Sequence, residues 1–282
     1  MFPFERIDPN PSKEPLGLIA GAGSFPQHIV HAYEAGPVYI AAFHGQTKST
    51  WPNRHHHQWF HIGQVGKVLQ YFKRNHVHIL SMAGNFTRPS LRSIQPDLDG
   101  IRLISRIGLR WDGDDFVMKK IIRFLQEDHG FIVKAPQDIA PHIVIRSTGA
   151  LGTHVPDENA KRDIQHGHKA LAITSELDFG QGIALQNGAI LGIEASEGTD
   201  QCIARCGQLA LDEGPRPVYV KRPKTRQSSD IDLPFIGAKT IMCLAHAGFQ
   251  GIAIQKDKTL AIDIQNVIHY ANQNGLFIWS DI

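Results

Sequence analysis

Short apolar runs alternate with stretches of helical periodicity along the first half of this chain. Helix-like stretches lie between the runs, after Pro26, Gly63 and Asp115. The runs, which predict strands, are residues 16–20, 38–43, 77–82 and 131–133. Alternation of this kind indicates a mostly parallel sheet with helices on both faces. We therefore predict an α/β domain over residues 16–145.

The pattern changes near residue 146. A long helix is predicted over residues 157–175, and Asn187-Gly188 between two apolar runs predicts a β-hairpin. The other predicted elements are strands at 218–220, 251–254 and 260–262 and a helix over 237–246. The second half is therefore predicted to be an α/β domain over residues 146–282 with a mixed or antiparallel sheet.

Composition limits the class of protein. The 29 basic and 27 acidic residues leave a net charge of +2, which argues against a nucleic-acid binder. Apolar stretches fall short of the roughly 20 residues of a membrane-spanning helix, and the first residues lack the apolar core of a signal peptide. We therefore expect a cytoplasmic protein in which residues 1–15, with four prolines, form a disordered lead-in.

The three cysteines fit the same compartment. Cys202 and Cys206 lie four residues apart in a predicted helix, and Cys243 is distant in sequence. Because no C-x-x-C pair occurs, structural zinc is disfavoured, and we expect reduced, partly buried thiols.

A glycine-rich turn, GAGSFP at residues 21–26, follows the first predicted strand. Its glycines would let a phosphate approach the backbone, and the following helix would present amide groups to an anion. However, Pro26 replaces the third glycine of the dinucleotide pattern, and His44 follows the second strand where a nicotinamide site needs an acid. The turn indicates a nucleotide or phosphate site rather than one for NAD. The alternative is a tight connection that binds nothing.

A polar segment leaves the predicted hairpin at residues 194–200. Glu194, Glu197 and the hydroxyl of Thr199 precede a helix, and such oxygen groups suit a hard cation or a phosphate. The alternative is structural, because Thr199 is also a good helix cap and acids favour a first helical turn. The spacing leaves both interpretations open.

A charged loop follows the strand predicted at 218–220. Two carboxylates, Asp230 and Asp232, come after four cations at positions 221, 222, 224 and 226. Chemistry on a diphosphate needs such a mixture, with cations for the phosphoryl oxygens and a carboxylate that holds Mg²⁺ or orients water. The alternative is a solvated charged loop.

Asn85 and Arg88 follow the third apolar run, in the segment MAGNFTRP. Ligands of open α/β sheets collect at the carboxyl ends of strands, so these side chains are candidates for contact with a base, ribose or phosphate.

Histidines at positions 55, 56, 57 and 61 resemble a metal cluster at first sight. They have no acid at the helical ligand spacing of H-E-x-x-H, so a surface histidine run is the favoured interpretation.

Together these stretches resemble the UDP-2,3-diacylglucosamine pyrophosphatase family of lipid A biosynthesis, of the Mg²⁺-dependent type. The matching segments, in order over roughly residues 16–280, are GLIAGAGSFP, MAGNFTRP, QPDL, GDD, FGQG, IEASEGTD, VKRPKTRQ, DIDLPFIG and GLFIW. The resemblance implies a Rossmann-like first domain that binds UDP and a second domain that holds the lipid portion. It implies hydrolysis of UDP-2,3-diacylglucosamine to UMP and 2,3-diacylglucosamine 1-phosphate (lipid X).

The resemblance also implies roles for individual residues. Asp232 would be the catalytic carboxylate and, with Glu194 and Glu197, a ligand of Mg²⁺ or Mn²⁺. The residues implied to bind substrate or nucleotide are Gly21, Gly23, Ser24, Asn85, Arg88, Gln181, Thr199, Lys221, Lys224 and Gln227. In one departure, the family commonly has a basic residue shortly before the aspartate of DLP, where this chain has Ser229 and Asp230. Arg226 or Lys224 would then compensate.

The implied partners are the lipid substrate, a transient contact with the membrane surface and a second copy in a homodimer. The main alternative is a nucleotide-sugar-binding protein that has lost catalytic turnover. The departure near Asp232 favours this alternative, and release of UMP from the substrate would exclude it. A weaker rival is a nicotinamide-dependent oxidoreductase, which an absence of NAD(H) binding would remove.

Overall fold

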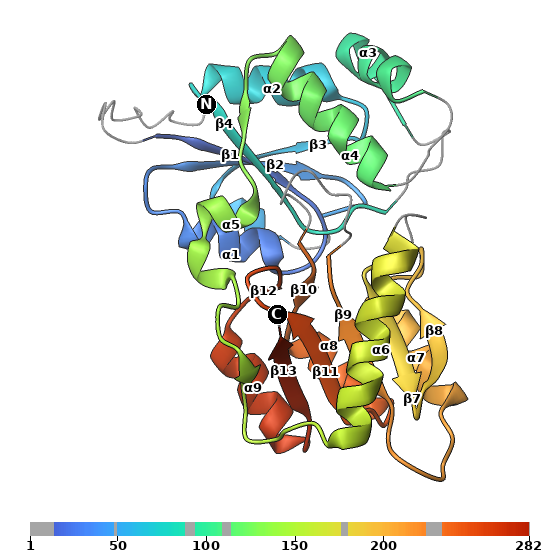
Figure 1. Cartoon of the computed structure of the whole chain (residues 1–282). Coiled ribbons are helices and arrows are strands. Elements are labelled where there is room, and N and C mark those ends of the chain that lie inside the picture. The colour runs from blue at the N-terminus through green and yellow to red at the C-terminus, as the bar shows by residue number, and fades with distance from the viewer. Residues whose placement is uncertain are drawn as a thin grey trace. The chain divides into compact units, whose positions relative to one another are not determined.

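The structure is a computed structural model that describes residues 14–47, 50–87, 94–108, 114–175, 180–223 and 233–281. The chain folds as two compact units, Met1–Ala140 and Pro141–Ile282 (Figure 1). Both units are α/β, which confirms the predicted fold class. Residues 1–13, most of the predicted lead-in, lie outside the described range.

The described part of the first unit contains a five-stranded parallel sheet in the order β3-β2-β1-β4-β5. Its strands are β1 (Leu16–Ala20), β2 (Val38–Phe43), β3 (His56–Phe60), β4 (Ile79–Ala83) and β5 (Ile132–Val133). The chain moves outward from β1 to β3 and returns to β4 on the other side of β1. Open α/β sheets bind ligands at such a switch point, beyond the carboxyl ends of the strands.

Helices cover both faces of this sheet, as its apolar strands require. In Figure 1, α2 and α4 lie on one side and α1 and α5 on the other, while α3 packs against α2 and α4. Phe72 of α2 and Phe124 pack with Phe60 and Leu80 in the core. The helical segments are α1 (Phe25–Ala32), η1 (Trp51–Arg54), α2 (Val65–Arg74), α3 (Leu98–Ile107), α4 (Asp114–Arg123), η3 (Phe124–Asp128) and α5 (Pro136–Ile139).

The sequence pattern did not predict β3, which contains much of the histidine run. Strand β3 lies at the sheet edge beside β2, so its side chains alternate between exposed and half-buried and need not be apolar. His56 is exposed, whereas His55 and His57 are half-buried. The run is therefore an edge strand, only partly at the surface. Helix α3 was also not predicted.

The described part of the second unit contains a six-stranded mixed sheet in the order β6-β13-β11-β9-β7-β8. The central strands β13, β11 and β9 are parallel, and the outer pairs are antiparallel. A two-stranded parallel sheet joins β10 to β12. The strands are β6 (Gly149–Ala150), β7 (Gly182–Gln186), β8 (Ala189–Ile193), β9 (Val218–Lys221), β10 (Phe235–Ile236), β11 (Gly251–Gln255), β12 (Leu260–Ala261) and β13 (Phe277–Asp281).

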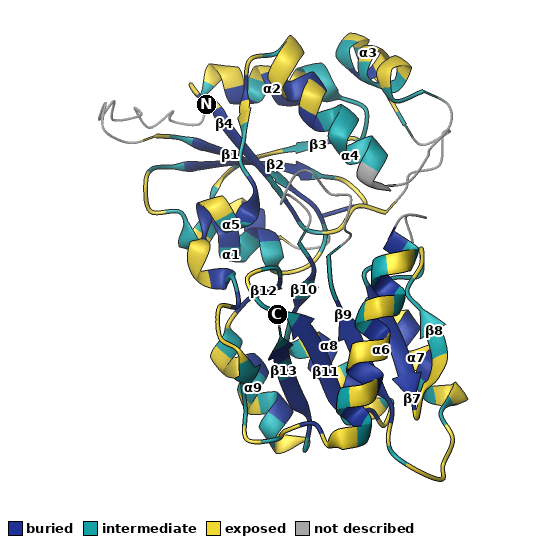
Figure 2. Cartoon of the chain, in the orientation of Figure 1, coloured by how far each residue is buried: buried dark blue, intermediate teal, exposed yellow. Residues whose placement is uncertain are grey.

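Two cores enclose the mixed sheet, and strands β7, β9 and β11 are its most buried part (Figure 2). Ile164 and Leu171 of α6 pack on one face, and Cys202, Ile241 and Val267 of the other helices pack on the opposite face. The helical segments are η4 (Pro141–Ile143), α6 (Glu158–Thr174), α7 (Thr199–Leu209), α8 (Ala238–His246) and α9 (Ile264–Gln273). Helix α9 and strand β13 were not predicted. None of the helices in the described ranges combines the length and apolar character needed to cross a membrane.

The predicted hairpin is confirmed as β7 and β8. Asn187 and Gly188 form its two-residue turn with φ of +50° and +84°, the left-handed values that this dipeptide favours. The Gly188 N–H donates to Oδ1 of buried Asp163 in α6 at 2.6 Å. Strand β8 carries one extra residue, Leu191, between the pairs Ala184–Gly192 and Leu185–Ile190, which makes a β-bulge.

Helix α6 begins at a capping carboxylate. Asp157 Oδ1 accepts a hydrogen bond from Ala160 N at 2.7 Å. Replacement of such a cap by alanine costs about 1 kcal/mol. We expect Asp157→Ala to lower the free energy of unfolding by about this amount in urea denaturation. Glu158→Ala is the matched control: it removes an adjacent acid whose side chain is 83% exposed, and a loss as large as that of Asp157→Ala would contradict the capping role.

Candidate active site

Two loops at the carboxyl edge of the first sheet are joined by backbone hydrogen bonds. Ala22 N donates to Asn85 O at 2.8 Å, and Asn85 N donates to Ala22 O at 3.1 Å. These loops follow β1 and β4, the strands that flank the switch point. Two segments expected to bind substrate, the glycine turn and the loop of Asn85, therefore lie side by side.

The two glycines of the turn serve different purposes. A Cβ on Gly21 would lie 2.6 Å from Asn85 O, so glycine is required there for the loops to pack together. Gly23 has a φ of +93°, which favours glycine, and no atom of the described residues lies within 4 Å of its would-be Cβ. Among the described residues, the space beside the Cα of Gly23 is open, whereas the space beside the Cα of Gly21 is filled by the Asn85 loop.

Helix α1 begins directly after this turn. Ser24 is the N-cap, and its carbonyl accepts hydrogen bonds from Gln27 N and His28 N at 3.1 and 3.3 Å. Pro26 is buried in the first helical turn, as predicted. The positive end of the α1 dipole thus lies at the loop edge of the sheet.

A third loop, which follows β2, is tied to the same edge. The Gln46 side chain donates to Thr87 O at 3.0 Å and accepts from Thr87 N at 2.8 Å, and the Thr47 hydroxyl donates to Ala20 O at 2.6 Å. Sequence reasoning missed these residues because it tested this position only for an acid. Their signal was a polar Gln-Thr pair that begins three residues after the end of the buried strand β2. Arg88 follows Thr87 but lies outside the described residues.

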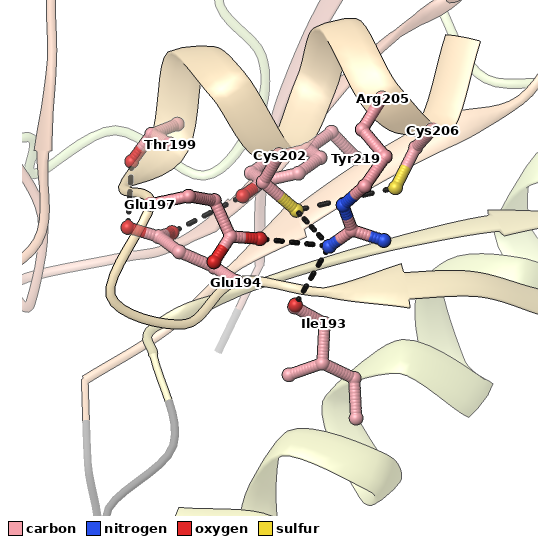
Figure 3. A network of polar contacts seen from close by, with 8 residues as sticks. All are labelled: Ile193, Glu194, Glu197, Thr199, Cys202, Arg205, Cys206 and Tyr219. Atoms are coloured by element: carbon pink, nitrogen blue, oxygen red, sulfur yellow. Dashed lines mark hydrogen bonds and ion pairs between the residues drawn. The ribbon is translucent and has the colours of Figure 1, made fainter. Parts of the chain in front are cut away.

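The polar network of the second unit joins four side chains (Figure 3 shows three of them). Lys221 Nζ donates to Thr199 Oγ1 at 2.6 Å, and Thr199 Oγ1 donates to Glu194 Oε1 at 2.9 Å. Tyr219 donates its hydroxyl proton to Glu194 Oε2 at 3.1 Å. Glu194, Thr199 and Lys221, which were expected to act at the site, therefore lie together. Tyr219 was missed, because its strand was classified only as an apolar run.

Three elements deliver these side chains. Glu194 follows β8 and is fixed by backbone pairs with Gly180 and Gly182, both at 2.8 Å. Lys221 ends β9 and lies two residues after Tyr219, so both side chains leave the same face of the sheet. Thr199 is the first residue of α7, and its cap is Gly198 rather than Thr199 itself. The hydroxyl of Thr199 is thus used in the network and not as a helix cap.

The hydrogen-bonding capacity of each side chain fixes which group donates and which accepts in this network. A lysine ammonium can only donate, so Thr199 Oγ1 must accept from it and send its own single proton to Glu194. Tyr219 directs its proton to the same carboxylate. Glu194 receives both and is therefore the ionised acceptor. Lys221 is only 6% exposed and also donates to Phe235 O at 3.3 Å, next to the DLP segment.

Glu197 has a different partner. Arg205 Nη2 donates to Glu197 Oε1 at 2.7 Å and to Ile193 O at 3.3 Å (Figure 3). The Arg205 hydrogen bond lowers the pKa of the Glu197 carboxyl, and the same pair raises the pKa of Arg205. The two carboxylates expected to share a metal thus make separate contacts. Across the described ranges, no group of three His, Cys, Asp or Glu side chains could hold a metal ion.

The remaining expected residues fall into two groups. The backbone carbonyl of Gln181 accepts from Arg222 N at 3.0 Å, which places Gln181 opposite the end of β9. The others lie outside the described residues: Lys224, Gln227, Asp230 and Asp232. The cysteines are free thiols; Cys202 and Cys206 are fully buried with their sulfurs 4.0 Å apart.

These features define a class of protein: two α/β units, the first a Rossmann-like sheet with a glycine turn at its switch point. Residues 15–143 match the family model of the LpxI N-terminal domain, and residues 147–279 match that of the LpxI C-terminal domain. The chain is 30% identical over 277 residues to UDP-2,3-diacylglucosamine pyrophosphatase LpxI of Caulobacter vibrioides, covering 93% of this chain and 96% of that protein. The chain therefore belongs to the LpxI family.

Gly182 provides a test of the packing around the network. A Cβ at this position would overlap the Tyr219 hydroxyl and lie 2.6 Å from Glu194 Oε2. Because both neighbours are held in place, we expect Gly182→Ala to lower the free energy of unfolding by about 1–3 kcal/mol, measured by urea denaturation.

The control for this prediction is the same substitution in a Tyr219→Leu background. Leucine lacks the ring atoms nearest Gly182, so alanine should cost less there than in the native background. Equal costs in the two backgrounds would show that crowding against Tyr219 is not the cause.

Proposed function

We propose that this protein hydrolyses the diphosphate of UDP-2,3-diacylglucosamine to UMP and 2,3-diacylglucosamine 1-phosphate, a step of lipid A biosynthesis. The name of the Caulobacter relative supports the substrate and the reaction. The observation that carries the proposal is the network of buried Lys221 with half-buried Thr199 and Glu194, because it holds a cation beside an ionised carboxylate. Its residues come from segments that also carry the family resemblance.

Lys221 is suited to stabilise charge on a phosphoryl group. In the reaction, the oxygen of water bonds to one phosphorus while the bond from the bridging oxygen to that phosphorus breaks, and negative charge shifts on the phosphoryl oxygens. Two of the three ammonium N–H bonds are directed to Thr199 and Phe235. We assign the third to a phosphoryl oxygen of the substrate. Burial strengthens this interaction because a low local dielectric screens charge weakly.

We assign the UDP portion to the carboxyl edge of the first sheet. Support comes from the switch point between β1 and β4 and from the space beside Gly23. The α1 N-terminus favours an anion at this edge. Ser24 and Asn85 are the described side chains proposed to contact the nucleotide, and Arg88 is proposed with them from the resemblance.

The described residues fit a divalent cation in part. Glu194 is an ionised carboxylate that accepts two hydrogen bonds and retains lone pairs for a further ligand. Glu197 fits less well, because the Arg205 cation beside it already compensates its charge and would repel a metal ion. We therefore propose Glu194 with Asp232 as the residues that hold Mg²⁺, with Mn²⁺ as a substitute. A bound cation would neutralise charge on the phosphoryl oxygens.

Metal removal tests this assignment. With excess EDTA, we expect release of UMP to fall to background, and added Mg²⁺ or Mn²⁺ should restore it. The measurement is chromatographic quantification of UMP from the purified enzyme. Full turnover in EDTA would overturn the metal dependence while leaving the proposed reaction in place.

Asp232 provides the sharpest test of the catalytic carboxylate. Asp232→Ala should reduce kcat by at least about 1000-fold and leave folding and substrate binding nearly intact, because a metal-holding or water-orienting carboxylate acts chiefly in the transition state. Intact substrate retained during purification would be seen by mass spectrometry.

Asp230→Ala is the matched control, since it removes the same charge two residues earlier. We expect it to keep activity within a few-fold of the wild type. If Asp232→Ala retains normal kcat, or Asp230→Ala is the more damaging, the catalytic assignment is wrong. The alternative, a silent nucleotide-sugar-binding protein, requires substrate binding with no UMP release from the wild type. From the family resemblance we further propose a homodimer that meets its lipid substrate at a membrane surface.

A further inference from the structure

We infer that Tyr219 is a positioning residue for the proposed hydrolysis: its hydroxyl holds the Glu194 carboxylate in one orientation and, through Thr199, holds the ammonium of Lys221. This inference rests on the proposed function and extends it to a side chain outside the segments that resemble the family. Tyr219 itself touches neither the substrate nor a metal in this proposal. It acts through Glu194.

The first line of argument is burial. Tyr219 is fully buried, and its ring packs edge-on against Phe249 with the centroids 6.2 Å apart. A buried hydroxyl without a partner is costly, so its hydrogen bond to Glu194 is strongly favoured. Burial therefore keeps the Tyr219 hydroxyl on the Glu194 carboxylate, which accepts from it at 3.1 Å.

The second line is the shape of the surrounding backbone. The hydroxyl occupies the place where a Cβ on residue 182 would stand, so Gly182 is the residue that makes room for it. The same residue pairs with Glu194, whose N–H donates to Gly182 O at 2.8 Å. The hydroxyl and the carboxylate are therefore brought together by one stretch of β7. A phenylalanine at 219 could fill the core equally well but could not hold Glu194.

The third line is the one-way order of the protons. Tyr219 and Thr199 each donate to a different oxygen of Glu194, so together they fix both the position and the rotation of the carboxylate. With Tyr219 removed, Thr199 alone would remain, and the carboxylate could turn about that single bond. Thr199 would move with it, and the ammonium of Lys221, which donates to Thr199, would no longer be held in one position.

The test is Tyr219→Phe in the full-length enzyme, assayed by UMP release from UDP-2,3-diacylglucosamine. We expect kcat to fall about tenfold, the size of effect that one hydrogen bond to a charged group gives. KM should change less than about threefold, because the nucleotide and lipid contacts are untouched. Tyr39→Phe, at a buried tyrosine of the other unit, should leave both values unchanged.

A double-variant cycle supplies a readout that does not depend on turnover. Urea denaturation of the wild type, Tyr219→Phe, Glu194→Gln and the double variant should reveal coupling of about tenfold in the unfolding equilibrium constant. Additive effects, or a kcat of Tyr219→Phe within twofold of the wild type, would overturn the inference. Wild-type protein that releases no UMP would instead overturn the proposed function, and with it any role of Tyr219 in that reaction, even if the coupling is found.

Discussion

A buried ammonium must be surrounded by acceptors, and Lys221 sets this condition for the second unit. Its charge lies at the end of a central strand with 6% exposure, where a lone cation would be strongly destabilised. Thr199 and the Phe235 carbonyl solvate it directly, and the Glu194 charge compensates it across one hydroxyl. The start of α7, the end of the hairpin and the strand after the DLP segment must all meet at this point. The arrangement of the site follows from this single requirement.

The loop edge of the first sheet differs, because backbone groups and neutral side chains make the polar contacts described there. Ala22 and Asn85 exchange backbone hydrogen bonds between two loops. The side-chain amide of Gln46 both donates to and accepts from the backbone of Thr87, as a neighbouring strand would. Such contacts make a stiff edge without using the charged side chains that a ligand would need. A stiff edge lowers the entropy lost when a ligand is ordered there. The two units thus differ in kind: backbone groups and neutral side chains hold the loop edge of the first, whereas the second has a charged side-chain network.

Much of this fold could be predicted because strands buried on both faces leave clear apolar runs. The predicted bounds of β1 and β2 agree with the structure, and Asn187-Gly188 identified the hairpin turn. Strand β3 escaped because an edge strand can be polar. The sequence spacing identified Glu194 and Thr199 as candidates. It could not decide whether Thr199 takes part in a polar network or caps a helix. That choice depended on Lys221, a partner 22 residues further along, and sequence carries no direct signal for such a distant contact.

The bulge at Leu191 has a consequence for how this family can change during evolution. Residues that pair directly across an antiparallel ladder place their side chains on the same face, and the pairing of β7 with β8 resumes beyond the bulge at Gly192 and Ile193. The bulge thus absorbs the additional residue, and Glu194 stays opposite Gly182, on the face where it meets Thr199 and Tyr219. Loss of one residue at the bulge could restore a regular ladder without turning the carboxylate to the other face. Lineages that keep the network should therefore keep the pairing of residues 182 and 194 more strictly than the length of the stretch between the hairpin turn and Glu194.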